Sequence, residues 1–330
     1  MKVKIIPVTA LTKRPEKTTR PVDLSPKLEV NSDGHPCSIH SASSLHSSAF
    51  LAPSEAFSQP PLPLTRLSTR ILHIWNTAGV ASIIAKFTDR EFGTSSTVIT
   101  RKAVDRVGLT TYGTAYTDGA ARFFSRALWM ARSADLVHVH SLDRVVPWLK
   151  RFYSKPVVMH YHGTDIEGRW REKRGRWSRS DYIAVSTPNL LEGAPSNAVH
   201  IPNPVDTDLF RPIPGERDPN LALSFRYGMD VEAEAIARKL GLNLVLLERW
   251  SVRYEQMPQT LCKYGYYIDM RKPPDHVVAR SVGKAALEAL ACGLRVIDWE
   301  GKVIETFPEE HAAQSVAARW NEIYLGLLKK

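Results

Sequence analysis

The segment 280–297, R-S-V-G-K-A-A-L-E-A-L-A-C-G-L-R-V-I, predicts a helix followed directly by a buried strand. Ser281 is suited to cap the start of the helix, and apolar residues then recur at spacings of three and four along one face. Gly293 fits the left-handed position in which many helices end, and the apolar run 294–297 continues as the strand. A helix and strand joined this closely are typical of an α/β domain.

The start of this helix predicts a binding site for a nucleotide. Ser281, Gly283 and Lys284 lie at its first turn, where unpaired backbone N–H groups bind phosphate readily. Lys284 and Glu288 lie one turn apart on the face away from the apolar residues, and the Glu288 carboxylate is suited to accept hydrogen bonds from a ribose diol. The alternative is an exposed Lys284–Glu288 ion pair worth about 0.2–0.5 kcal/mol.

The second half of the segment, L-E-A-L-A-C-G-L-R-V-I, resembles the donor-binding helix of GT-B fold glycosyltransferases, in particular the retaining family GT4 (group 1). The pattern in that family is E-x7-E followed by A-x-A-x-G-x-P-V. The resemblance implies two Rossmann-like domains with a cleft between them, and it implies that Glu288 binds the nucleotide ribose. Arg280 stands where the family has the Glu that contacts the donor sugar, so this contact departs from the pattern.

Composition fits a two-domain protein with an anionic partner. The chain has 330 residues, is 43% hydrophobic and carries a net charge of +10, which suggests nucleotide phosphates, a lipid surface or nucleic acid as a partner. Its three cysteines are widely spaced without a CxxC pair, so we expect no disulfide framework and no zinc site. There is no apolar run of about 18 residues. We expect a cytoplasmic protein, peripheral at the inner membrane face.

The N-terminal residues 1–68 differ from the rest of the chain. They are rich in Ser, Pro, Thr and His and contain few apolar residues in a periodic pattern. Such a composition buries too little apolar surface to offset the entropy lost on ordering. We therefore expect a disordered extension, and an alternative hypothesis is that translation begins near Leu67, so that the extension does not exist in the native protein.

The first predicted domain covers residues 69–211 and opens with a strand at 70–75, the turn N-T-A-G and a helix. This strand–turn–helix unit begins a doubly wound sheet. Gly79 in the turn resembles the Gly-rich first loop of GT-B enzymes, whose backbone approaches the donor phosphates. The alternative is a plain tight turn.

Two later strands of this domain are followed by histidines. The segment 134–141, A-D-L-V-H-V-H-S, predicts a buried strand on which His140 either faces the cleft or packs inside. The segment 155–168 places His162 and Asp165 just beyond the next strand, where ligands bind in such sheets. Its H-G-T-D sequence resembles the acceptor-side loop of GT4 enzymes. The resemblance implies that His162 hydrogen-bonds the transferred sugar and that Asp165 orients His162 or an acceptor hydroxyl; a structural pair is the alternative.

A basic, Trp-containing segment follows at 168–180. Cations beside tryptophans suit an anionic membrane surface or a lipid phosphate, and nucleic acid bases stack on tryptophans as well. A solvated turn with its tryptophans packed inward is the third interpretation. The residues proposed for an acceptor or membrane surface are Arg169, Trp170, Arg171, Arg174 and Trp177.

The second predicted domain covers residues 212–308, and a last helix at 309–330 is expected to return to the first domain. The segment 199–210, V-H-I-P-N-P-V-D-T-D-L-F, resembles the GT-B segment that links the two domains. The resemblance also implies an Arg and a Lys that neutralise the diphosphate leaving group. Arg226 stands at a suitable place for the Arg. No Lys follows at the family spacing, and Arg249 and Lys284 are candidate substitutes.

Taken together, these motifs predict transfer of a sugar from a nucleotide-sugar to a lipid-linked or other glycan, such as a polyprenyl-phosphate-linked acceptor, with retained configuration. We expect no cofactor beyond the nucleotide-sugar co-substrate and no metal, because the D-T-D sequence at 206–208 lies in the linking segment. We expect no nucleic acid partner, because the basic residues form no recognisable reading motif. The alternatives are a nucleotide-sugar epimerase or hydrolase of the same fold and a non-catalytic binding protein.

Overall fold

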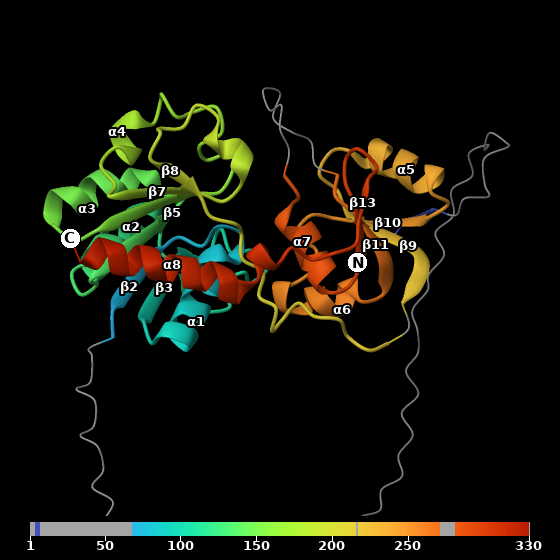
Figure 1. Cartoon of the computed structure of the whole chain (residues 1–330), viewed down its shortest axis with the longest axis horizontal. Coiled ribbons are helices and arrows are strands. Elements are labelled where there is room, and N and C mark those ends of the chain that lie inside the picture. The colour runs from blue at the N-terminus through green and yellow to red at the C-terminus, as the bar shows by residue number, and fades with distance from the viewer. Residues whose placement is uncertain (1–3, 7–67, 216, 271–280, 330) are drawn as a thin grey trace, which may run out of the picture. The chain divides into compact units, whose positions relative to one another are not determined.

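The computed structural model describes residues 4–6, 68–215, 217–270 and 281–329 (Figure 1). Most of the predicted disordered extension 1–68 therefore lies outside the described residues, as does Arg280. Three residues of the extension differ from the prediction, because Lys4–Ile6 forms strand β1 and pairs antiparallel with β10 (Asn243–Leu247). Backbone pairing covers an edge of the sheet that would otherwise present unpaired N–H and C=O groups.

The first sheet has seven strands, and every pair of neighbours is parallel. Because both of its faces are covered, its central strands are short, buried apolar runs. In spatial order the strands are β4 (Thr114–Tyr116), β3 (Ser95–Arg101), β2 (Arg70–Ile74), β5 (Leu136–His140), β6 (Val157–Tyr161), β7 (Tyr182–Val185) and β8 (Ala198–His200).

The two faces of this sheet contact different helices. Alternate strand residues such as Leu72 and Val139 pack towards α2 (Ala120–Ala131) and α3 (Val146–Phe152). The intervening positions, such as Ile71, pack towards α1 (Val80–Phe92) and the C-terminal helix. Because side chains alternate along a strand, the histidines of β2, β5 and β6 all fall on this second face. A short helix, α4 (Arg174–Trp177), follows β6.

The C-terminal helix α8 (Ala313–Leu328) belongs to the core of the first sheet. Val316, Trp320 and Tyr324 are buried against residues of β2, β5 and β6. A β-bridge between Val205 and Ala312 joins the linking segment to the start of this helix.

The second sheet has a parallel centre with an antiparallel strand at each edge. Three helices accompany it: α5 (Asp230–Lys239), α6 (Met257–Leu261) and α7 (Lys284–Ala291). Among the residues described, no helix is long and apolar enough to cross a membrane. In spatial order the strands are β1, β10, β9 (Asp218–Phe225), β11 (Tyr264–Ile268), β12 (Arg295–Ile297) and β13 (Val303–Ile304).

Helix α7 and strand β12 form the predicted helix–strand unit. Ala286, Leu287 and Ala289 are buried against the second sheet. Gly293 has a φ of +80°, the left-handed conformation predicted for the end of the helix. The start differs from the prediction, because Gly283 and not Ser281 is the N-cap residue.

Candidate functional site

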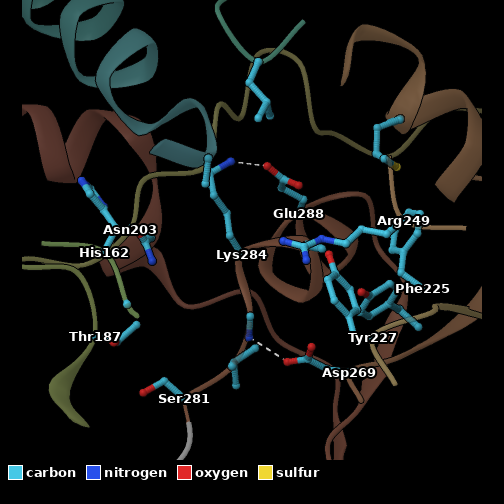
Figure 2. A pocket seen from close by; sticks show the side chains of 18 of the residues that line it. His162, Thr187, Asn203, Phe225, Tyr227, Arg249, Asp269, Ser281, Lys284 and Glu288 are labelled. Atoms are coloured by element: carbon cyan, nitrogen blue, oxygen red, sulfur yellow. Dashed lines mark hydrogen bonds and ion pairs between the residues drawn. The ribbon is translucent and has the colours of Figure 1, made fainter. Parts of the chain in front are cut away.

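A cavity of about 590 Å³ is lined by loops that follow strands of both sheets (Figure 2). His162 lines it from the first sheet, and Glu288 lines it from the second. The predicted convergence of one imidazole and one carboxylate on a shared cavity is therefore present, while their roles stay predictions. Ser281, Gly283 and Lys284 also line this cavity.

Lys284 and Glu288 form an ion pair, and this pair is buried at the cavity wall. Their side chains are only 11% and 7% exposed. The Tyr254 hydroxyl donates a hydrogen bond to Glu288 Oε1 at 2.8 Å and accepts one from Lys284 Nζ at 2.9 Å. Burial and the neighbouring Glu288 carboxylate raise the pKa of Tyr254 well above its usual value. The sequence suggested an exposed Lys284–Glu288 ion pair as the alternative to ribose binding. The structure contains this ion pair, but the pair is buried.

Asp269 binds one of the backbone N–H groups that the sequence predicted to bind phosphate. It directly follows β11, and its buried carboxylate accepts a hydrogen bond from the Gly283 N–H at 2.7 Å. Ser281 does not cap the helix; its hydroxyl donates to Asn189 Oδ1 at 3.2 Å. Sequence reasoning missed Asp269, although an acidic residue at the carboxyl end of a buried strand is a usable signal for a site residue.

The prediction that Arg226 binds the donor is corrected, because Arg226 does not line the cavity. Its guanidinium pairs with Asp230 Oδ2 at 2.5 Å and with Glu248 Oε1 at 3.1 Å. Arg249 does line the cavity, with its guanidinium 5.1 Å from the centre of the Tyr227 ring. Of these two arginines, only Arg249 is therefore placed to meet an anionic ligand there.

Trp250 is a second cavity residue that the sequence did not single out. It has a φ of +66° and its side chain is 42% exposed. A bulky residue in the left-handed region is unusual and costs about 1–3 kcal/mol, so such a residue is a candidate for a functional role. Its ring lies 4.7 Å from the Arg249 guanidinium. The cavity wall on this side is aromatic, with Phe225, Tyr227 and Tyr267 also lining it (Figure 2).

His162 lies on the opposite side of the cavity, next to Asn203 (Figure 2). Its Nε2 is 3.1 Å from Nδ1 of His140, a strand residue that is fully buried. Burial lowers the pKa of His162 to about 3, and a hydrogen bond with Asn203 opposes this shift. The imidazole is therefore neutral at neutral pH and serves as a hydrogen-bonding group without a charge.

Asp165 holds the backbone of this loop and does not line the cavity. Its carboxylate accepts hydrogen bonds from the N–H of His162 at 3.1 Å and of Gly163 at 2.7 Å. Burial raises its pKa. These contacts fit the prediction that Asp165 orients His162, here through the backbone of the loop, and a role at an acceptor hydroxyl stays a prediction.

The basic segment does not present its tryptophans to the surface. Trp170 is 4% exposed and donates from its indole to the Leu190 carbonyl, and the indole of Trp177 donates to the Trp170 carbonyl. Arg169 pairs with Glu172. The inward-packed interpretation is the correct one for both tryptophans, because each indole finds its partner inside the loop. Arg171 and Arg174 are exposed, as predicted for a surface.

Gly79 serves the turn and does not line the cavity. Its φ is +78°, and a Cβ atom there would lie 3.3 Å from the Leu109 carbonyl oxygen. The neighbouring Ala78 lines the cavity in its place. The plain-turn interpretation of Gly79 therefore fits the structure.

Comparison with known proteins identifies the architecture. The sequence matches no protein-family model and no curated protein. AviGT4, a glycosyltransferase involved in avilamycin A biosynthesis, superposes with a TM-score of 0.54 and 14% identity over 79% of this chain and 98% of its own. The fold is that of GT-B glycosyltransferases. At this identity the similarity establishes the fold and not the substrates.

A second similar structure corrects one prediction about partners. It is an α-glucosyltransferase in complex with UDP and a 13-mer DNA containing an HMU base, with a TM-score of 0.52 and 14% identity over 78% of this chain and 90% of its own. The sequence analysis excluded a nucleic acid partner, and this exclusion is wrong, because a protein of this fold binds DNA. The lack of a familiar reading motif in the sequence was not a sufficient reason to exclude one.

Proposed function

We propose that this chain transfers a sugar from a nucleoside diphosphate sugar to an acceptor hydroxyl. The observation that carries this proposal is the shared cavity, which joins His162 of the first sheet to Lys284, Glu288 and Arg249 of the second. Its volume of about 590 Å³ lies within the usual range for small-ligand sites. We also propose that the transferred sugar retains its configuration and that the mechanism resembles that of GT4 enzymes.

The ion pair at the start of α7 suggests how the donor is held. In the free protein, Lys284 and Glu288 compensate each other's buried charge. On donor binding, the ribose hydroxyls replace Lys284 as partners of the Glu288 carboxylate, and Lys284 turns to the phosphates. Each hydrogen bond from ribose to this carboxylate contributes about 1.5–3 kcal/mol.

The leaving diphosphate gains negative charge during transfer, and cations aimed at it lower the barrier. Arg249 is held between Tyr227 and Trp250 at the cavity wall, so its guanidinium needs little reorganisation to meet the phosphates. Lys284, once released from Glu288, supplies a second positive charge. Asp269 keeps the Gly283 N–H occupied, which leaves these two side chains as the main neutralising groups.

His162 serves the sugar end of the donor in this proposal. Its imidazole, which burial keeps neutral, donates or accepts a hydrogen bond at a sugar hydroxyl. Asn203, its neighbour in the cavity, is a second polar group for the same sugar.

The charge of the chain and the comparison with known structures suggest the acceptor. A net charge of +10 favours an anionic acceptor. DNA is the first acceptor to test, since a similar structure contains a 13-mer DNA. A panel of glycans is the matched alternative.

A thermal-shift screen with UDP-, GDP- and ADP-sugars tests the proposal, followed by an assay of nucleotide release with and without acceptor. We expect one nucleotide class to raise the melting temperature and release to require an acceptor. Release of the nucleotide without any acceptor would favour a hydrolase. Conversion of the nucleotide-sugar into a different nucleotide-sugar, without transfer to an acceptor, would favour an epimerase. No stabilisation by any nucleotide would contradict the proposal.

A further inference from the structure

Five histidines lie together on the α8 face of the first sheet, and the proposed reaction uses only one of them. They come from β2, β5, β6 and the residue after β6. Strand register places His73 beside His138 and His140 beside His160. The four residues within the strands are fully buried. The five are His73, His138, His140, His160 and His162.

His160 is the least satisfied member of this cluster. It is 0% exposed, and neither of its ring nitrogens has a hydrogen-bond partner. A buried polar group without a partner costs about 1–3 kcal/mol, and unpartnered groups of this kind in native proteins point to a bound water or ion. His160 is therefore suited to a ligand that the described residues do not supply.

Three of the histidines are arranged so that one ion can contact them all. His140, His160 and His162 each offer a ring nitrogen, and the three nitrogens lie within 4.8 Å of one another. His140 Nδ1 and His162 Nε2 are 3.1 Å apart. Tetrahedral zinc with Zn–N bonds of about 2.0–2.1 Å holds its ligand nitrogens about 3.3–3.4 Å apart, so this pair needs only a small adjustment.

The outer contact of His140 also fits a metal site. Histidine ligands usually hydrogen-bond through the ring nitrogen that does not bind the metal, which fixes the ring orientation. The other nitrogen of His140, Nε2, lies 3.2 Å from Nδ1 of His73. His162 has Asn203 beside it.

We propose that His140, His160 and His162 form a binding site for a zinc-class transition-metal ion at the base of the cavity. An all-imidazole ligand set suits zinc and its neighbours and does not suit magnesium or calcium, which prefer oxygen. Three protein ligands leave a fourth position for water, and one of the three ligands, His162, lines the cavity. The site shares His162 with the proposed sugar transfer, but the argument for it does not rest on that transfer.

A neighbouring trio, His73, His138 and His140, meets the same distance criterion. It shares His140 with the first trio, but all three of its members are fully buried. His138 already has a partner, because its Nδ1 lies 2.8 Å from the Tyr324 hydroxyl. The trio containing His160 is favoured because it has the unpartnered imidazole and because one member, His162, is only partly buried and lines the cavity.

The test uses the full chain without a polyhistidine tag, stripped with EDTA and titrated with Zn²⁺ against a chelating indicator. We expect about one Zn²⁺ per chain, and a Co²⁺ derivative with the visible absorption of a four-coordinate site. His160→Asn should weaken Zn²⁺ binding at least tenfold. His138→Asn is the matched control, equally buried on the adjacent strand, and should retain binding.

The proposal is overturned if the wild-type chain binds no Zn²⁺, if His160→Asn binds as tightly as wild type, or if His138→Asn alone abolishes binding. Should His160→Asn fail to fold, the melting temperature of the wild-type chain decides: it should rise with Zn²⁺ and not with Mg²⁺, and no difference between the two ions would contradict the site. None of these measurements requires a donor or an acceptor, so their failure is separate from failure of the proposed transfer.

Discussion

The first sheet presents one uncharged imidazole, His162, and one carboxylate, Glu167, to the cavity, whereas the second presents a lysine, an arginine and two carboxylates. His162 is kept neutral by burial, while Lys284 and Glu288 form a buried ion pair. A neutral group suits a sugar, and charged groups suit a nucleoside diphosphate. The difference therefore divides the proposed donor between the two sheets, with the nucleotide on the second and the sugar facing the first.

The largest expected effect of a substitution is at Glu288. Glu288→Ala removes the ribose acceptor and leaves Lys284 buried without its partner, so we expect kcat/KM to fall about 100-fold, equivalent to about 2.7 kcal/mol. Nucleotide release measures this loss. Glu248→Ala is the control, because its side chain is 68% exposed and pairs with Arg226 away from the cavity. Equal activity of the two variants would remove Glu288 from the site.

The two arginines of the second sheet allow a matched comparison. Arg249→Ala removes a cation from the cavity wall, and we expect a tenfold fall in kcat/KM for the donor. Arg226→Ala removes an arginine that is already paired with Asp230 and Glu248, and we expect a change of less than twofold. Steady-state kinetics with varied donor decides between them. A larger loss in Arg226→Ala would restore the role that the sequence first suggested.

The buried histidines also make the first sheet sensitive to acid. Burial lowers the pKa of His73 from 6.5 to about 4. Below pH 6.5 the unfolded chain binds a proton that the folded chain does not, so stability is present above pH 6.5 and is lost as the pH falls towards 4. One such histidine costs about 1.4 kcal/mol per pH unit in this window.

Urea unfolding at pH 7 and pH 5, with EDTA present, measures this effect. Hydrogen exchange locates it: peptides from β2, β5 and β6 should lose protection at pH 5 before those from β9 and β10, because the described part of the second sheet contains no buried histidine. Equal loss of protection in the two sheets, after correction for the intrinsic exchange rates, would show that the histidines do not control acid stability.

The fold was predictable because its signals are local. Gly293 ends α7 in the left-handed conformation that its sequence position suggested. The apolar runs at 136–139 and 157–160 each fall within a buried parallel strand. His162 directly follows one of these strands and lies at the cavity, as its place in the sequence suggested.

The finer features of the site depend on side-chain direction, which sequence order does not give. Arg226 and Arg249 follow neighbouring strands, yet local carboxylates hold only Arg226 away from the cavity. Trp170 has the sequence context of a surface residue, but its indole finds a carbonyl acceptor inside the loop. The histidine cluster joins three strands whose residues are far apart in sequence, so no local sequence motif predicts it.

The activity of His162→Ala, assayed beside direct binding of the nucleoside diphosphate, tests most directly whether the two sheets divide the donor. We predict that kcat/KM for the nucleotide-sugar falls at least tenfold in this variant, while its affinity for the nucleoside diphosphate alone stays within twofold of wild type. Glu288→Ala should lose affinity for both ligands. Full activity of His162→Ala, or loss of nucleoside diphosphate binding in a folded His162→Ala protein, would contradict the division.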